Sequence, residues 1–265
     1  MTFKRLRGGK TINSETAAKL SFSAKEQLSE AVRAQFSETA LLPDELSSSA
    51  EKINASGYSV LRIGHNFNEY CEAVSKTAVF KSFRMEICKT VFDLCEKSKT
   101  FLERKELLLL CKIPSENIFV DIDSERFCYA ILDLILNAAE NTPEKGKIRI
   151  TVSKTKKFAK ISVCDNGYGM DEETVLHCFE PFFSKSYSRK KTKMGLGLTL
   201  VHYFAAESGG RVSVSSKPGK GTSVSVLLPL SSAKGTDLSV SAPVQEIPGG
   251  KFSPVYVMLS GIEKE

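Results

Sequence analysis

The sequence predicts an α+β protein in which a helical hairpin precedes one sheet covered by helices on one face. Three patterns indicate this fold class. Apolar and small residues recur as a heptad seam over residues 46–74. Apolar residues also recur at three- and four-residue steps over 127–138, as on a buried helix. Alternating apolar and polar residues over 147–152 and 159–163 predict two half-buried strands.

Residues 14–76 are expected to form a helical hairpin that dimerises. High helical propensity over 14–39 is broken near Leu42-Pro43-Asp44, where Asp44 offers an N-cap for a second helix. Two such hairpins would bury their seams as a four-helix bundle, so a homodimer is expected.

The second unit, residues 80–230, is expected to hold the sheet. Its elements, in order, are a helix over 85–97, apolar runs at 107–113 and 118–122, a helix from Asp123 to Pro143, the two strands above, and a last hairpin around Pro218-Gly219. Residues 231–265 resemble a linker in composition, with an apolar stretch near Tyr256 that suits an added strand or a docking segment.

A polar stripe runs along the helix that Asp123 is expected to cap. Asp133, Asn137 and Asn141 follow one another at steps of four residues, so they share one side of the helix. Their carboxylate and amide oxygens suit a hydrated cation and phosphates, and magnesium needs few protein ligands. The alternative is an ordinary solvated helix face.

Two glycine-rich segments follow. Residues 165–170 (Asp-Asn-Gly-Tyr-Gly-Met) combine a carboxylate that can accept from an adenine amine with glycines that admit a flat ligand. Taken alone, the segment is better explained by a tight strand-to-helix turn. Residues 194–198 open a helix that ends at Gly209-Gly210, and the N-terminus of such a helix suits phosphate. Between them, Phe179–Phe183 precede a polar, basic stretch over 184–193, expected to be a lid or a plain surface loop.

This order of motifs, closed by Pro218-Gly219-Lys220-Gly221-Thr222, resembles the N, G1, F, G2 and final glycine boxes of the Bergerat-type ATP-binding domain, and most closely that of the sensor histidine kinases. The resemblance implies a Bergerat-type α/β sandwich that binds ATP and Mg²⁺. Asn137 would ligate magnesium, Asp165 would accept from the adenine amine, and Asp133 stands where ATP-hydrolysing relatives keep a glutamate base. The nucleotide-binding residues that it implies are Asn137, Glu140, Asn141, Asp165, Gly167, Gly169, Met170, Gly195, Leu196, Gly197, Leu198 and Thr222.

Two positions depart from the family pattern. Glu140 stands where kinases often keep a lysine, and a carboxylate facing phosphate is repulsive unless magnesium or a lysine intervenes. Lys185, or the basic stretch after it, is expected to supply that charge as a catalytic residue. Lys193 replaces the first glycine of the second loop.

The phosphoacceptor is not where the family keeps it. Phe22 occupies the position of the acceptor histidine, and phenylalanine cannot form a phosphoramidate. The histidines of the chain are His65, His177 and His202. His65 lies one residue past the heptad seam, at a flank where a nucleophile could face solvent, and it is the candidate acceptor beside the alternative of a plain surface residue.

The sequence therefore favours a protein kinase of the histidine kinase type, which passes the γ-phosphate to a histidine or to a partner such as a response regulator. One alternative is a nucleotide-gated interaction module without phosphotransfer, since Phe22 replaces the acceptor. Another is a serine kinase on the same domain.

Composition excludes several other classes. The net charge of +6 is modest and interspersed, which argues against a nucleic-acid binder. No run is long enough to cross a bilayer and no secretion signal is present, so a cytoplasmic protein is expected. Seven cysteines without a Cys-x-x-Cys pair favour reduced thiols over a zinc site or a disulfide framework.

Overall fold

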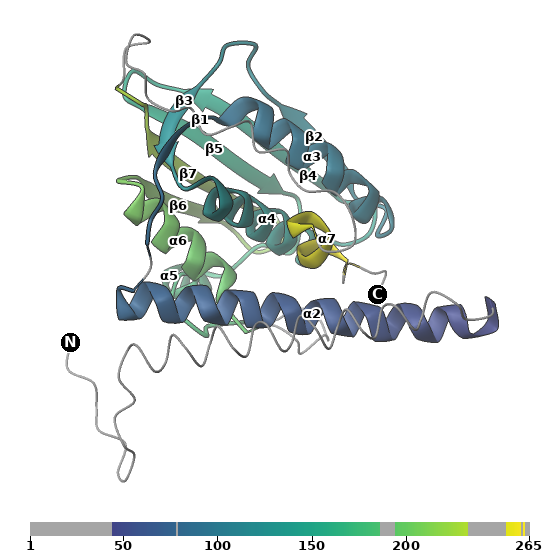
Figure 1. Cartoon of the computed structure of the whole chain (residues 1–265). Coiled ribbons are helices and arrows are strands. Elements are labelled where there is room, and N and C mark those ends of the chain that lie inside the picture. The colour runs from purple at the N-terminus through teal and green to yellow at the C-terminus, as the bar shows by residue number, and fades with distance from the viewer. Residues whose placement is uncertain (1–43, 78, 186–193, 233–252, 261, 263–265) are drawn as a thin grey trace.

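A five-stranded mixed sheet frames the protein, and helices cover one of its faces (Figure 1). The computed structural model describes residues 44–77, 79–185, 194–232, 253–260 and 262. The strand order is β2-β4-β5-β7-β6, with β2 parallel to β4 and the other neighbours antiparallel. The strands are β2 (Leu108–Lys112), β4 (Lys147–Lys154), β5 (Phe158–Asp165), β6 (Arg211–Ser216) and β7 (Thr222–Pro229). The predicted α+β class is confirmed.

A smaller antiparallel pair, β1 (Phe83–Glu86) with β3 (Phe119–Ile122), lies beside this sheet and touches it through a bridge between Val120 and Leu230. The start of the predicted helix over 85–97 therefore belongs to a strand. The helix itself, α3 (Ile87–Glu103), begins where the Glu86 carboxylate accepts from the backbone N–H groups of Cys88 and Lys89.

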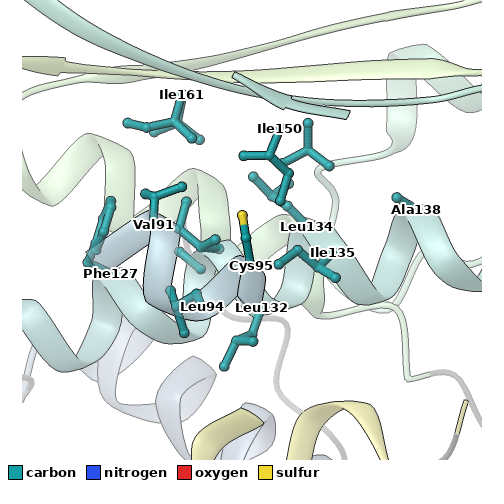
Figure 2. Close-up of a cluster of buried hydrophobic side chains, with 14 of the residues drawn as sticks. Val91, Leu94, Cys95, Phe127, Leu132, Leu134, Ile135, Ala138, Ile150 and Ile161 are labelled. Atoms are coloured by element: carbon teal, nitrogen blue, oxygen red, sulfur yellow. The ribbon is translucent and has the colours of Figure 1, made fainter. Parts of the chain in front are cut away.

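The core lies between the sheet and the helices α3, α4 (Ser124–Glu140) and α6 (Gly197–Glu207). Ile150 and Ile161 point from the sheet toward Val91, Phe127 and Leu134 of the helices, as Figure 2 shows. This packing follows from the alternation of apolar and polar residues in the sequence. In β4 the apolar residues are buried in the core, while Lys147 and Arg149 are exposed. Asp123 caps α4 as predicted, since its side chain accepts from the N–H groups of Glu125 and Arg126.

Helix α2 (Asp44–Ser75) lies along the lower edge of the sandwich, against α6 and the C-terminal helix (Figure 1). One of its sides, which carries Tyr58, Arg62 and His65, is buried. Val60 and Phe67, at seven-residue spacing on the opposite side, are 44% and 45% exposed. These two belong to the predicted heptad seam, so the described residues leave this part of the seam uncovered. The first helix of the predicted hairpin, with Phe22, falls outside the described residues.

The described part of the tail is a helix and not the added strand that its apolar residues also suited. Ser253 caps α7 (Pro254–Leu259), and Val255, Met258 and Leu259 are buried against α2, α3 and α4. Proline at the first position with a serine cap before it favours the helix. Within the described ranges, no helix combines the length and apolarity needed to span a membrane.

Candidate nucleotide site

A cavity of about 140 Å³ opens between α2, α4, α5 (Glu172–His177) and the start of α6. Ligand cavities usually measure roughly 300–1,000 Å³, so the walls must move apart to admit a whole nucleotide. Residues from all the predicted boxes that fall in the described chain meet here. Predicted site residues on its walls are Asp133, Asn137, Glu140, Asn141, Gly169, Met170, Lys185, Gly195, Leu196, Gly197, Leu198 and Thr222.

Asp165 lies directly behind this wall, at the end of β5. Its Oδ1 accepts from the backbone N–H groups of Gly167 (2.8 Å) and Thr222 (3.1 Å), so the carboxylate is tied to a residue that does line the cavity. Burial raises the pKa of Asp165, and the two backbone donors oppose that rise. With Oδ1 engaged in this way, Oδ2 is the oxygen left to accept from an exocyclic amine.

The loop after β5 packs on the C-terminal end of α4 too closely for side chains. A Cβ on Gly167 would lie 1.9 Å from the carbonyl oxygen of Asn141, and the N–H of Tyr168 donates to that same oxygen at 3.0 Å. Gly169 has φ of +69°, and a Cβ there would lie 2.0 Å from the Lys217 carbonyl oxygen. Gly167 itself does not line the cavity. Its role is to let the Asp165 loop approach α4.

The polar stripe of α4 faces the cavity as the four-residue spacing predicted. Asn141 donates from Nδ2 to both the backbone oxygen (2.7 Å) and Oδ1 (3.2 Å) of Asn137, which fixes that amide. The described residues contain no cluster of three acidic, histidine or cysteine side chains that could hold a metal alone. The Asn137 amide and the Glu140 carboxylate are hard oxygen donors of the kind that Mg²⁺ accepts beside phosphate oxygens.

Helix α6 begins at the cavity. Its N-cap, Leu196, has no side-chain bond to the first turn, and residues 195–198 line the cavity, so this helix N-terminus is chemically suited to an anion. The Phe182 N–H donates to the Gly195 carbonyl oxygen at 3.0 Å, which ties the phenylalanine motif to this loop. A Cβ on Gly197 would lie 3.0 Å from Asp133 Oδ1, so glycine is what lets α6 start against α4.

Asp133 is buried between this cavity and a larger one of about 450 Å³, which lies further along the same face of α2, beside His65 and Glu69. Burial raises its pKa to about 7, while Arg62 and a 3.5 Å hydrogen bond from Asn66 Nδ2 act in the opposite direction. A carboxyl group with a pKa near neutrality can exchange a proton at physiological pH, as a base role requires.

A pH dependence of stability follows from Asp133. Its folded pKa lies above the ordinary value of 3.8, so unfolding releases a proton between about pH 4 and 7, and stability falls as pH rises through that range. The penalty above pH 7 is on the order of 4 kcal/mol. Urea unfolding of Asp133→Asn should lose this decline and exceed the wild type at pH 8. An identical pH slope in both proteins would contradict the assignment.

One sequence expectation, that His65 faces solvent, is wrong, and the role predicted for Lys185 stays a prediction. Lys185 lines the cavity, and its Nζ lies 2.9 Å from a carboxylate oxygen of both Asp171 and Glu173. His65 does not face solvent: it is 9% exposed, and its ring stacks on Tyr129 of α4 with centroids 3.8 Å apart. The side of α2 that was interpreted as a flank of the bundle is the side that packs on the α/β sandwich.

Sequence reasoning missed the residues that α2 gives to the cavity, namely Arg62, Ile63 and Asn66. No nucleotide motif includes them, because they lie about 70 residues before Asn137 and reach the site only through packing. The available signal was a second face of α2, outside the heptad seam, on which Tyr58, Arg62 and His65 recur at helical spacing.

Residues 122–232 match the family described as histidine kinase-, DNA gyrase B- and HSP90-like ATPase. The chain is 30% identical over 139 residues to the adaptive-response sensory kinase SasA of Rippkaea orientalis, covering 52% of this chain and 36% of that protein. It is 27% identical over 197 residues to the histidine protein kinase DivJ of Caulobacter vibrioides, covering 71% and 32%. The chain thus spans about a third of the length of these relatives.

Solved structures show the same fold. Full-length ShkA, solved in complex with AMPPNP, superposes with a TM-score of 0.68 over 84% of this chain and 47% of that one, at 22% identity. The histidine kinase AdeS of Acinetobacter baumannii superposes with a TM-score of 0.56 over 83% and 99%, at 17% identity. Both likenesses extend beyond the residues of the family match.

Proposed function

We propose that this chain, whose residues 122–232 form a sensor histidine kinase catalytic domain of the histidine kinase-, DNA gyrase B- and HSP90-like ATPase family, binds Mg-ATP and transfers the γ-phosphate to a protein in two-component signalling. The observation that supports this most is the shared wall of the cavity. Asn137 lies on it, and Asp165 is bonded to Thr222 on the same wall.

In this proposal the protein acts by positioning. Asp165 accepts from the adenine amine, and the loop of Gly167 and Gly169 holds it at the C-terminal end of α4. The first turn of α6 donates N–H groups to phosphate oxygens. Mg²⁺, held by Asn137 and Glu140, would supply charge neutralisation between phosphates. Asp133 lines the cavity beyond Asn137, and its near-neutral pKa suits removal of a proton from the acceptor.

The acceptor and the assembly belong to the same proposal. His65 can serve only after α2 leaves α4, because stacking on Tyr129 covers it. A residue on another protein, such as a response regulator, is therefore the first acceptor to test. The exposed side of α2 with Val60 and Phe67 supports a homodimer that buries this seam in a helical bundle.

Labelling with γ-labelled ATP and Mg²⁺ tests the proposal. We expect acid-labile label on the chain or on an added receiver protein. If His65→Ala removes the label from the chain, His65 is the acceptor, whereas acid-stable label would indicate a serine kinase. The His177→Ala variant, changed at an exposed histidine on α5, is the matched control.

The burial of His65 favours a second candidate, a nucleotide-gated interaction module. In that case ATP binds and changes the packing around the cavity without phosphotransfer. Measurable ATP affinity with no label on either protein would select this reading over the kinase.

A further inference from the structure

Helix α2 supplies one wall of the cavity and brings a positive charge to it. Arg62 lines the cavity although it is only 9% exposed, and Ile63 and Asn66 lie beside it. A buried guanidinium is costly unless anions or hydrogen-bond acceptors compensate it. In the described structure Arg62 has one hydrogen bond, from Nη1 to the Met258 carbonyl oxygen at 3.2 Å, and an attraction to Asp133 without an ion pair within 4.0 Å.

The charges on the cavity wall single out this arginine. Among the described lining residues, the acidic ones are Asp133 and Glu140, and the basic ones are Arg62 and Lys185. Lys185 is held by Asp171 and Glu173 at 2.9 Å each. Glu140, at the position where related kinases often keep a lysine, adds negative charge. Among the described residues of the wall, Arg62 is therefore the cation that no carboxylate within 4.0 Å pairs.

The order of residues along α4 gives the end of the nucleotide that Arg62 would meet. Asn141 touches the Asp165 loop, which receives the base. Asn137 lies one turn before Asn141 on α4, and Asp133 lies one turn before Asn137. Asp133 is the residue that attracts Arg62. At a rise of about 1.5 Å per residue, each step is about 6 Å along the helix. Arg62 thus lies at the far end from the base, where the last phosphate would be.

The tail helix α7 holds Arg62 in this place. Met258, whose carbonyl accepts from Arg62, is fully buried, and Tyr256 of α7 packs on Tyr58 of α2 with ring centroids 5.0 Å apart. One bond fixes the guanidinium, which carries five N–H donors, so donors remain for a ligand. A group held in advance loses less entropy when the ligand binds.

We propose that Arg62 contacts the terminal phosphate of the bound nucleotide. Arg62 on α2 then supplies the positive charge that Glu140 on α4 does not provide. This inference rests on the proposed function, because it assumes that the cavity takes ATP. It assigns Arg62 as a residue that distinguishes ATP from ADP.

Calorimetric affinities for ATP and ADP, both with Mg²⁺, test it on the full chain. Arg62→Met should weaken ATP on the order of tenfold or more, because a hydrogen bond to a charged group is lost, and should change ADP affinity by less than about threefold. Arg62→Lys should keep part of the preference, since lysine retains the charge without the fork of donors. Arg211→Met, at an exposed arginine on β6 over the Phe158 ring, should leave both affinities unchanged.

An unchanged ratio of ATP to ADP affinity in Arg62→Met would overturn the assignment. Thermal melting accompanies each titration, and if the methionine variant does not fold, the ratio in Arg62→Lys decides in the same way. Failure of the wild type to bind either nucleotide would instead overturn the proposed function itself. The two failures are therefore distinguishable.

Discussion

Asp165→Asn is expected to lower the affinity for ATP on the order of 100-fold while the chain stays folded. The asparagine oxygen can still accept from the Gly167 and Thr222 N–H groups, so the loop keeps its two anchors. The new amide then points an N–H group at the adenine amine, and two donors face one another without an acceptor. Calorimetry with Mg-ATP measures the loss, and thermal melting shows that the fold is intact.

Asp121→Asn is the matched control for this change. Asp121 is exposed on β3, so its substitution removes the same charge from the chain away from the cavity. Wild-type affinity in Asp165→Asn, or an equal loss in both variants, would show that the carboxylate does not receive the base.

Asn137→Ala is expected to remove the dependence of ATP binding on Mg²⁺. The Asn137 side-chain oxygen, which accepts a hydrogen bond from Asn141 Nδ2, is the proposed metal ligand on the cavity wall. Alanine offers no oxygen in its place. With few protein ligands available, the loss of one should weaken Mg-ATP on the order of 10- to 100-fold and leave metal-free ATP nearly unchanged. Titrations with Mg²⁺ and with a chelator measure the difference.

Asn117→Ala, at an exposed position before β3, is the control for the loss of an amide. A magnesium effect on Asn137→Ala as large as that on the wild type would place the metal on other residues.

The sheet and α4 could be predicted because their residues follow local rules. The two-residue alternation of β4 and β5 and the helical spacing with the Asp123 cap fix strand faces and helix bounds within a few residues. The nucleotide boxes could be recognised for the same reason: each is a short segment whose chemistry is read without knowledge of its neighbours. Asn137 and Asp165 were predicted in this way, and the structure brings their segments together.

The contribution of α2 could not be predicted in the same manner. Its heptad seam predicted a bundle interface on the side that carries Val60 and Phe67. The side that packs on the sandwich is instead the one that carries Arg62 and His65. Which face of an amphipathic helix meets another domain depends on long-range packing, and that packing here includes α7. Burial of His65 and the pairing of Lys185 with Asp171 and Glu173 were likewise decided by distant contacts.

A structure of the full chain with Mg²⁺ and a non-hydrolysable ATP analogue tests the central claim most directly. We expect the adenine amine within hydrogen-bond distance of Asp165 Oδ2, the metal on Asn137 Oδ1, and the last phosphate toward Arg62. An analogue seated in the larger cavity on the other side of Asp133, or one with its base away from Asp165, would contradict it.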